Sequence, residues 1–196
     1  MNNKIEITLA ARYPALLFSN QACERDVFGF ECLDGWYSLI EGSLFLIRQY
    51  AESDVTVTQV KEKFGQLRIY LRGGNECIDF ITALTELVSG CICERCGRPG
   101  KIVSAEGWLV ARCNSHRNHH YYEEQQSDAA VDERFVSEYA QAVGSIWAFF
   151  AASALSWVRQ PSLPLGNRLP YEMLGTKEGC KAVYTLLGRL EHGVGV

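Results

Sequence analysis

One spacing occurs twice near the middle of the chain, as Cys93-x2-Cys96 and, sixteen residues later, as Cys113-x2-His116. A Cys-x2-Cys turn aims two thiolates at one point, and a following glycine, here Gly97, lets backbone amides turn toward the sulfurs. Two such half-sites complete a closed Cys3His shell of the kind that holds zinc. Because four protein ligands leave no open coordination position, the pattern predicts a structural Zn2+ ion as cofactor rather than a catalytic one.

Three further residues are able to replace a ligand of this site. Cys91 lies two residues before Cys93, and His119 and His120 follow shortly after His116. The Cys113-x2-His116 pair mirrors the first half-site, so it is the preferred assignment. The alternatives stay open at this point.

The number of cysteines makes the cellular compartment important, because it decides whether thiols form disulfides. The chain has eight, and its first residues lack the apolar stretch of a secretory signal, since Glu6 and Arg12 interrupt it. A cytoplasmic location is therefore expected, in which thiols stay reduced. Cys32, Cys77 and Cys180 fall in segments with packing patterns, so we expect them to be buried free thiols.

Charge gives weak guidance on partners. The 196 residues carry a formal net charge of −4, which is not typical of a nucleic-acid or anionic-membrane binder. Basic residues do cluster around the cysteine motif, so contact with nucleic acid is left open. They are Arg95, Arg98, Lys101, Arg112 and Arg117.

The first part of the chain mixes helix and strand patterns. Apolar residues at helical spacing predict two helices, and alternation of apolar and polar residues predicts strands. The expected elements are a helix over 36–51, a strand over 55–60, a reversal over 61–66, a strand over 67–72 with one wet face, a helix over 78–88, and a short hairpin over 102–110 between the two half-sites.

The last part is almost entirely helical. We expect a turn over 163–167, a short helix over 171–174 and a last helix that Thr176 caps, with an apolar face formed by Val183, Leu186, Leu187 and Leu190. A polar connector at 121–127 precedes an amphipathic pattern over 129–158, and 20 residues of it, 139–158, are uncharged. That length is enough to span a bilayer. Its serines, alanines and single apolar stripe favour the buried helix of a soluble protein with no membrane contact. The wide apolar stripe also suggests pairing in a homodimer.

These patterns predict an α+β protein of two parts. Residues 1–120 form an N-terminal mixed α/β module with a structural zinc hairpin, and residues 128–196 form an all-α domain. The sequence shows no nucleophile elbow, phosphate-binding glycine loop or HExxH motif, so the chain is not expected to be an enzyme.

Residues 12–116 resemble a family of uncharacterised phage and bacterial proteins that carry a zinc motif. The resemblance rests on Tyr13-Pro14, on the segments 28–36 and 59–70, and on the Cys93, Cys96, Cys113 and His116 set. It implies a phage-related origin and supports the same ligand set, and the family carries no known activity.

A second resemblance covers residues 147–196. It rests on Ala154-Leu-Ser-Trp157, on Arg168-Leu-Pro-Tyr-Glu-Met-Leu174, on Thr176-Lys-Glu-Gly179, and on the leucine pattern that ends at His192-Gly193. This order and spacing resemble the Xre/MbcA/ParS-type antitoxin toxin-binding domain. Members of that family pair with RES-domain toxins, which act on NAD or ADP-ribose chemistry. They usually carry a helix-turn-helix region ahead of this domain, where this chain has the zinc module instead.

The resemblance implies an antitoxin that binds and neutralises a cognate protein toxin of RES type. We expect the end of the last helix and the tail to contact the toxin, with two residues of the preceding turn nearby. The alternatives are a zinc-containing regulator that binds nucleic acid through 91–120, and a phage or defence adaptor with another protein partner. The expected partner-binding residues are Arg168, Tyr171, Arg189, Glu191, His192, Gly193 and Val196.

Overall fold

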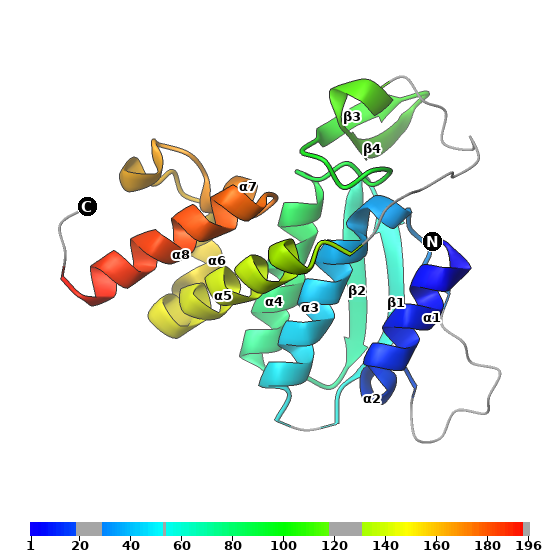
Figure 1. Ribbon diagram of the computed structural model, residues 1–196, viewed down its shortest axis with the longest axis horizontal. Coiled ribbons are helices and arrows are strands. Elements are labelled where there is room, and N and C mark those ends of the chain that lie inside the picture. The colour runs from blue at the N-terminus through cyan, green and yellow to red at the C-terminus, as the bar shows by residue number, and fades with distance from the viewer. Residues whose placement is uncertain (19–28, 53, 118–130, 194–196) are drawn as a thin grey trace.

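The computed structural model describes residues 1–18, 29–52, 54–117 and 131–193, and within these it is an α+β protein (Figure 1). Helices form most of it, and the strands form two separate two-stranded antiparallel hairpins, β1 with β2 and β3 with β4. The predicted fold class is confirmed. The predicted connector at 121–127 lies outside the described residues.

The chain begins with two short helices that the sequence patterns did not predict. They are α1 (Asn3–Arg12) and α2 (Pro14–Leu17). The side chain of Asn2 caps α1 by accepting a hydrogen bond of 2.9 Å from the amide of Lys4. Ile5 and Leu9 of α1 are buried, so this segment closes one side of the core.

Two longer helices carry most of the first module, and both were expected. A 3-10 turn, η1 (Asp34–Trp36), leads into α3 (Tyr37–Tyr50), and Asn75 caps α4 (Glu76–Ser89) by accepting from the amide of Ile78. Their apolar stripes are buried.

The first hairpin joins β1 (Thr56–Lys63) to β2 (Gln66–Arg72). The predicted reversal at 61–66 is wrong in its extent: Lys61 to Lys63 stay in the strand, and the turn consists of Phe64 and Gly65 alone. A β-bulge between Val57 and Gln59 adds one residue to β1. Because of it, both Val57 and Val60 point into the core although three positions separate them.

The expected single helix over 129–158 is wrong, because the backbone breaks near its end. α5 (Glu133–Phe150) ends at Ala151, which has a φ of 42°, in the left-handed region. A 3-10 turn, η3 (Ala151–Ser153), then leads to α6 (Ala154–Val158). The rings of Phe150 and Trp157 stack across this break with their centroids 4.6 Å apart.

The remaining elements follow the prediction. They are a turn, η4 (Leu163–Leu165), a short helix, α7 (Pro170–Met173), and the last helix, α8 (Lys177–Glu191). Thr176 caps α8 by accepting from the amide of Gly179 at 3.1 Å, as expected. Figure 1 shows α8 crossing α5 and α6 and extending away from the rest of the molecule at its C-terminal end.

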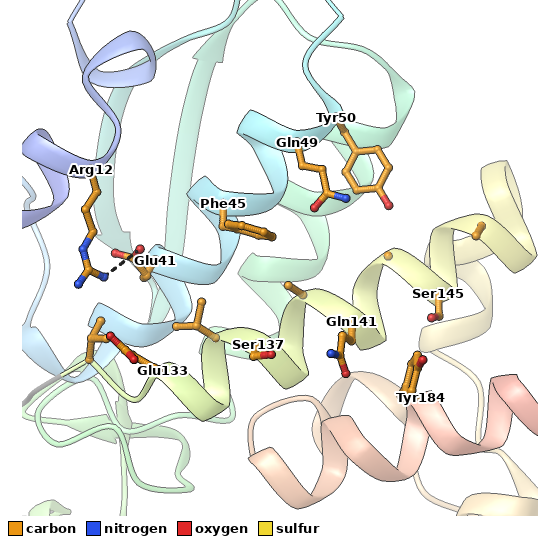
Figure 2. Close-up of a pocket in the computed structure, with 15 residues that line it drawn as sticks. Arg12, Glu41, Phe45, Gln49, Tyr50, Glu133, Ser137, Gln141, Ser145 and Tyr184 are labelled. Carbon is orange, nitrogen blue, oxygen red and sulfur yellow. Dashed lines mark ion pairs between the residues drawn. The ribbon is translucent and has the colours of Figure 1, made fainter.

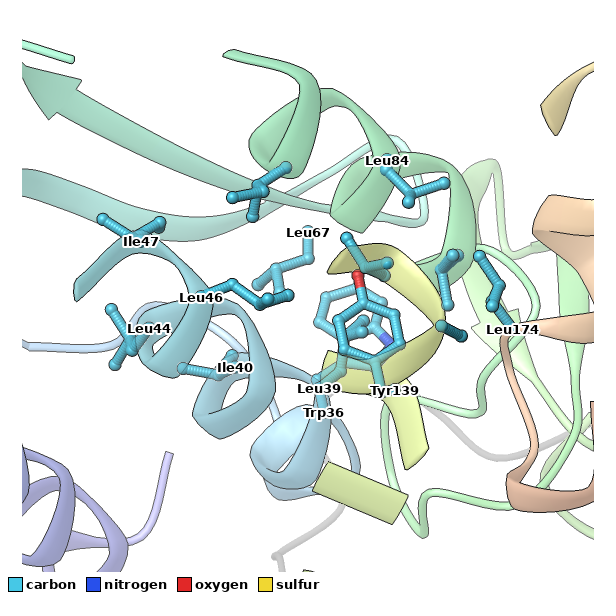
Figure 3. Close-up of a cluster of buried hydrophobic side chains, with 14 of the residues drawn as sticks. Trp36, Leu39, Ile40, Leu44, Leu46, Ile47, Leu67, Leu84, Tyr139 and Leu174 are labelled. Atoms are coloured by element: carbon cyan, nitrogen blue, oxygen red, sulfur yellow. The ribbon is translucent and has the colours of Figure 1, made fainter. Parts of the chain in front are cut away.

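One hydrophobic core runs through both predicted parts (Figure 3). Trp36 of η1 and Tyr139 of α5 are fully buried at its centre. α5 packs closely on α3 at Gly42, where an added Cβ would lie 2.9 Å from the ring of Tyr139. The glycine inside α3 therefore allows the helical region to approach the first module.

By length and composition, the helical stretch Glu133–Val158 is able to cross a membrane, although core helices of soluble proteins pass the same test. Within its most apolar window 28% of residues are buried. The sequence predicted a buried helix, but only one stripe of it is buried. That stripe packs on α3 and α8.

Candidate metal centre and partner-binding surface

The two cysteine half-sites lie on different structures. The first lies on a tight turn, residues 93–97, which we call the knuckle, and the second follows a hairpin. Cys93 and Cys96 belong to a tight turn after α4, in which the amide of Gly97 donates to the carbonyl of Cys93 at 2.9 Å. Gly97 has a φ of 73°, which few residues other than glycine adopt at low cost. The hairpin of β3 (Lys101–Ala105) and β4 (Trp108–Arg112) then returns the chain to the knuckle.

The second half-site follows β4 directly. Cys113 ends the strand, and a 3-10 turn, η2 (Asn114–His116), brings the imidazole of His116 back beside it. Burial alone would raise the pKa of the Cys113 thiol. Hydrogen bonds from the backbone of His116 and from neighbouring groups outweigh the effect of burial, so the net effect lowers the pKa. The turn therefore aims amide groups at a sulfur, as a thiolate ligand requires.

The structure brings the four predicted ligands together: their ligand atoms all lie within 4.8 Å of one another. The Sγ atoms of Cys96 and Cys113 are 3.7 Å apart, too far for a disulfide bond. The Nδ1 atom of His116 lies 3.5 Å from Cys93 Sγ and 3.4 Å from Cys113 Sγ.

These separations fit a tetrahedron around zinc. With Zn–S bonds of about 2.3 Å and a Zn–N bond of about 2.0 Å, the tetrahedral edges are about 3.8 Å between two sulfurs and about 3.5 Å between sulfur and nitrogen. These three pairs of donors therefore stand at the spacing expected around a zinc ion. All four positions of that tetrahedron are protein atoms, which suits a structural ion.

The alternative ligands do not join this cluster as far as the structure describes them. Cys91 is outside the group; its thiol faces the carbonyl of Leu87, and burial raises its pKa to about 11. His119 and His120 lie outside the described residues. Cys32, Cys77 and Cys180 are buried free thiols, as expected.

A buried ion pair lies directly behind the metal centre. Glu94, between the two cysteines of the knuckle, pairs with Arg112 at the end of β4, and both side chains are almost fully buried. Burial raises the pKa of Glu94 to about 7, although Arg112 opposes this shift. The second carboxylate oxygen and two guanidinium nitrogens have no hydrogen-bond partner. The pair thus links the two halves of the site at a high desolvation cost.

The knuckle is packed against the start of α3. The amide of Gly35 donates to the carbonyl of Glu94 at 2.8 Å, and the indole of Trp36 donates to the carbonyls of Ser89 and Ile92. A Cβ added at Gly35 would lie 2.3 Å from the carbonyl oxygen of Cys93, so only glycine fits here.

The largest cavity that we describe lies elsewhere, between α3 and α5 (Figure 2). It is an open groove of about 750 Å³, and Tyr184 of α8 closes one end. Glu41 on its wall accepts a hydrogen bond of 2.6 Å from Tyr13 and pairs with Arg12 at 3.3 Å. The described lining holds no cysteine or histidine.

The predicted partner-binding residues occupy two places. Arg189, Glu191, His192 and Gly193 are exposed at the end of α8. Arg168 is exposed in the turn before α7, where its carbonyl accepts from the amide of Ser162 at 3.0 Å, and Tyr171 of α7 is half-buried. Val196 lies outside the described residues.

Two exposed apolar residues, which the sequence did not single out as contacts, lie close in the chain to these predicted residues. Leu163 of η4 is 83% exposed, and Leu190 of α8, expected on the buried face, is 37% exposed. Leu190 is exposed because the last turn of α8 extends past the helices that it packs on (Figure 1). A shallow groove of about 440 Å³ lies between η4 and α8, and Arg189 lines it. Leu163 was recognisable as a large apolar residue placed in a turn beside proline.

α5 to α8 thus form a small helical unit with exposed apolar and charged residues at its tip. Residues 144–193 match the family model described as the antitoxin Xre/MbcA/ParS C-terminal toxin-binding domain. The match runs from the middle of α5 to the residue after the cap of α8, and it supports an antitoxin-type role. The expected resemblance of this region is confirmed; that of residues 12–116 is not and stays a prediction. No curated protein and no solved structure matches the chain.

Proposed function

We propose that this chain is a cytoplasmic, non-enzymatic antitoxin that neutralises a protein toxin of RES type by binding it through the end of α8. The observation that carries the proposal is the coincidence of the matched region, residues 144–193, with a helical unit whose tip exposes apolar side chains. RES-type toxins act on NAD, so a segment that covers such a toxin's active site would stop that activity.

The proposed contact surface has a defined composition. Leu163 of η4 and Leu190 of α8 supply exposed apolar area on the two elements that border the groove, and Arg189 lines the groove itself. Glu191 and His192 extend it toward the tail, and Arg168 and Tyr171 flank it from the turn before α8. A few buried anchors surrounded by charged residues are the usual arrangement of a tight interface.

The proposed metal role is structural. Zn2+ bound by Cys93, Cys96, Cys113 and His116 would hold β3, β4 and the knuckle in place, and through Gly35 it would brace the start of α3. We propose that residues 1–120 and 128–196 divide the work as framework and toxin-binding domain, although they share one core.

Co-expression with a RES-domain toxin encoded beside this chain tests the proposal. We expect the wild-type chain to restore growth and to co-purify with the toxin. Leu190→Asp and Arg189→Glu are expected to abolish both, because the first places a charge on exposed apolar surface and the second reverses the charge of a residue that lines the groove.

Lys4→Glu, which changes an exposed residue of α1 far along the chain from this surface, is the matched control and should rescue growth fully. Failure of the wild-type chain to bind or to counteract any neighbouring toxin would refute the antitoxin proposal. Rescue by both α8 variants would refute the proposed surface only.

A further inference from the structure

The outer face of the β1–β2 hairpin differs in charge from the rest of the protein. Segment 56–72 carries four basic residues and one acidic residue, whereas the whole chain has a net charge of −4. The strand register explains where they point. Val60, its cross-strand partner Ile69 and Leu67 face the core, so the alternate positions, which include Lys61, Arg68 and Tyr70, face outward.

The acidic residues nearby are largely engaged. Arg68 pairs with Glu86 of α4, and Glu62 accepts a hydrogen bond from the amide of Gly65. Glu31 accepts from the side chain of Gln59 at 3.1 Å. These hydrogen bonds leave Glu62 and Glu31 charged, so Lys61, Lys63 and Arg72 give the face a small excess of positive charge.

Aromatic rings lie among these cations. Tyr70 is 40% exposed and Phe64 is 63% exposed. The ammonium group of Lys61 lies 5.2 Å from the ring centroid of Tyr70, and that of Lys63 lies 5.5 Å from that of Phe64. Each exposed ring thus has a cation beside it, at the spacing of a cation–π contact.

Phe64 is held exposed at a cost in backbone energy. It has a φ of 57° and Gly65 a φ of 77°, so both central residues of the two-residue turn are left-handed. Such turns favour asparagine or aspartate before the glycine, and a bulky residue there is strained. Neither burial nor turn geometry explains a phenylalanine at this position. A strained, exposed aromatic residue instead indicates a binding role.

We infer that this face, formed by Lys61, Lys63, Phe64, Tyr70 and Arg72, binds single-stranded nucleic acid. Bases stack on Tyr70 and Phe64, and the ammonium groups that cover these rings in the free protein move to the adjacent phosphates. Interleaved rings and cations suit single strands, whose bases are free to stack, and they need no particular sequence. β1 spans about 26 Å at roughly 3.3 Å per residue, which accommodates a few nucleotides.

This site is separate from the proposed toxin-binding surface. Figure 1 places β1 and the free end of α8 on opposite sides of the molecule, so both ligands fit at once. It also differs from the basic cluster around the cysteines, where Arg112 is buried in its pair with Glu94. Nucleic-acid binding at this face does not depend on the antitoxin role.

Fluorescence anisotropy with labelled oligo(dT) on the full-length, zinc-loaded protein tests it. We expect binding that weakens steeply between about 50 and 200 mM salt. The variant Lys61→Gln/Lys63→Gln/Arg72→Gln should bind at least tenfold more weakly, and its log–log salt slope should fall by about 2, at about 0.7 per phosphate contact. Tyr70→Leu should bind about fivefold more weakly or worse, through lost stacking.

Two comparisons exclude indirect effects. Lys4→Gln/Arg98→Gln/Lys101→Gln removes the same charge from exposed sites elsewhere and should bind within twofold of wild type. Phe64→Asn relieves the turn, so it should raise the melting temperature while weakening binding. A structural role for Phe64 predicts the opposite change in stability.

Three outcomes would overturn the inference: no binding of oligo(dT) by the wild-type protein at low salt, equal loss in the two triple variants, or tighter binding of the annealed duplex than of the single strand.

Discussion

The metal centre and the C-terminal helices are held in place by different forces. β3 is exposed or half-exposed along its whole length, and Val110 and Ala111 are the only buried apolar residues that the structure describes in the β3–β4 hairpin. The region around it therefore relies mainly on the four candidate ligand atoms, the Glu94–Arg112 pair and a few backbone hydrogen bonds. α5 and α8 are instead fixed by apolar stripes that pack on α3 and on each other. A region held by a few polar contacts should fail abruptly when one is lost, whereas apolar packing should weaken by degrees.

The largest effect is expected from the metal ligands. Cys96→Ser should abolish zinc binding and unfold the β3–β4 hairpin, because structural zinc contributes about 10 kcal/mol or more of apparent binding free energy in small zinc-binding peptides. Elemental analysis and circular dichroism measure the two effects. Cys91→Ser, which changes the neighbouring thiol outside the cluster, should keep one zinc per chain. Normal folding and zinc content in Cys96→Ser would contradict the proposed site.

The buried ion pair comes next. Arg112→Ala should reduce the free energy of unfolding by about 3–5 kcal/mol, because it leaves the carboxylate of Glu94 buried without a partner. Urea denaturation measures the loss. The double variant Glu94→Leu/Arg112→Met should be far more stable than the single one, since no buried charge remains. Equal instability of both would show that the pair is needed for more than charge compensation.

The helical region should respond in a graded way. Leu187 of α8 is buried, and Leu187→Ala should cost about 2–5 kcal/mol through the cavity that it leaves. Zinc content should stay at the wild-type level. The exposed Leu190 offers the matched comparison: Leu190→Ala should cost less than about 1 kcal/mol and yet weaken toxin binding. A loss of zinc in Leu187→Ala would mean that the two regions are not separable in this way.

The smallest effect is expected where the two helix starts meet. Lys177 of α8 pairs with Asp132, the N-cap of α5, at 2.9 Å, and both side chains are about 40% exposed. Lys177→Ala should cost less than about 1 kcal/mol. The hydrogen bond from Lys177 lowers the pKa of Asp132 below its ordinary 3.8. The stabilisation from this ion pair is thus present above pH 3.8 and is lost as the pH falls through the lowered pKa of Asp132. The wild-type protein and Lys177→Ala should therefore become equally stable in acid.

Patterns that depend on local spacing were predictable from the sequence. The Cys-x2-Cys and Cys-x2-His pairs specify a common point because each pair sits on one tight turn, and the intervening hairpin is short. The stripes of α3 and α4 follow directly from a period of 3.6 residues. The cap of Thr176 needs only residues within one turn of helix.

Features set by distant contacts were not predictable in this way. Ala151 favours helix, and its left-handed backbone accompanies contacts made by residues outside that turn: Phe150 stacks on Trp157, and α6 buries Ala154 and Val158. The bulge in β1 hides the true alternation, since Val57 and Val60 share a face only when one residue is inserted between them. The exposure of Leu190 likewise depends on where the neighbouring helices end.

The close contact at Gly35 has a consequence for the rate of folding. Gly35 meets the carbonyl oxygen of Cys93 and the amide of Cys96 across some sixty residues of chain, whereas the four ligands lie within 24 residues of one another. The knuckle is thus a local structure, and its docking on α3 closes a much longer loop. If zinc binds before docking, it prepares the surface that α3 must find, and the metal accelerates folding. If it binds afterwards, the folding rate is unchanged and only unfolding becomes slower.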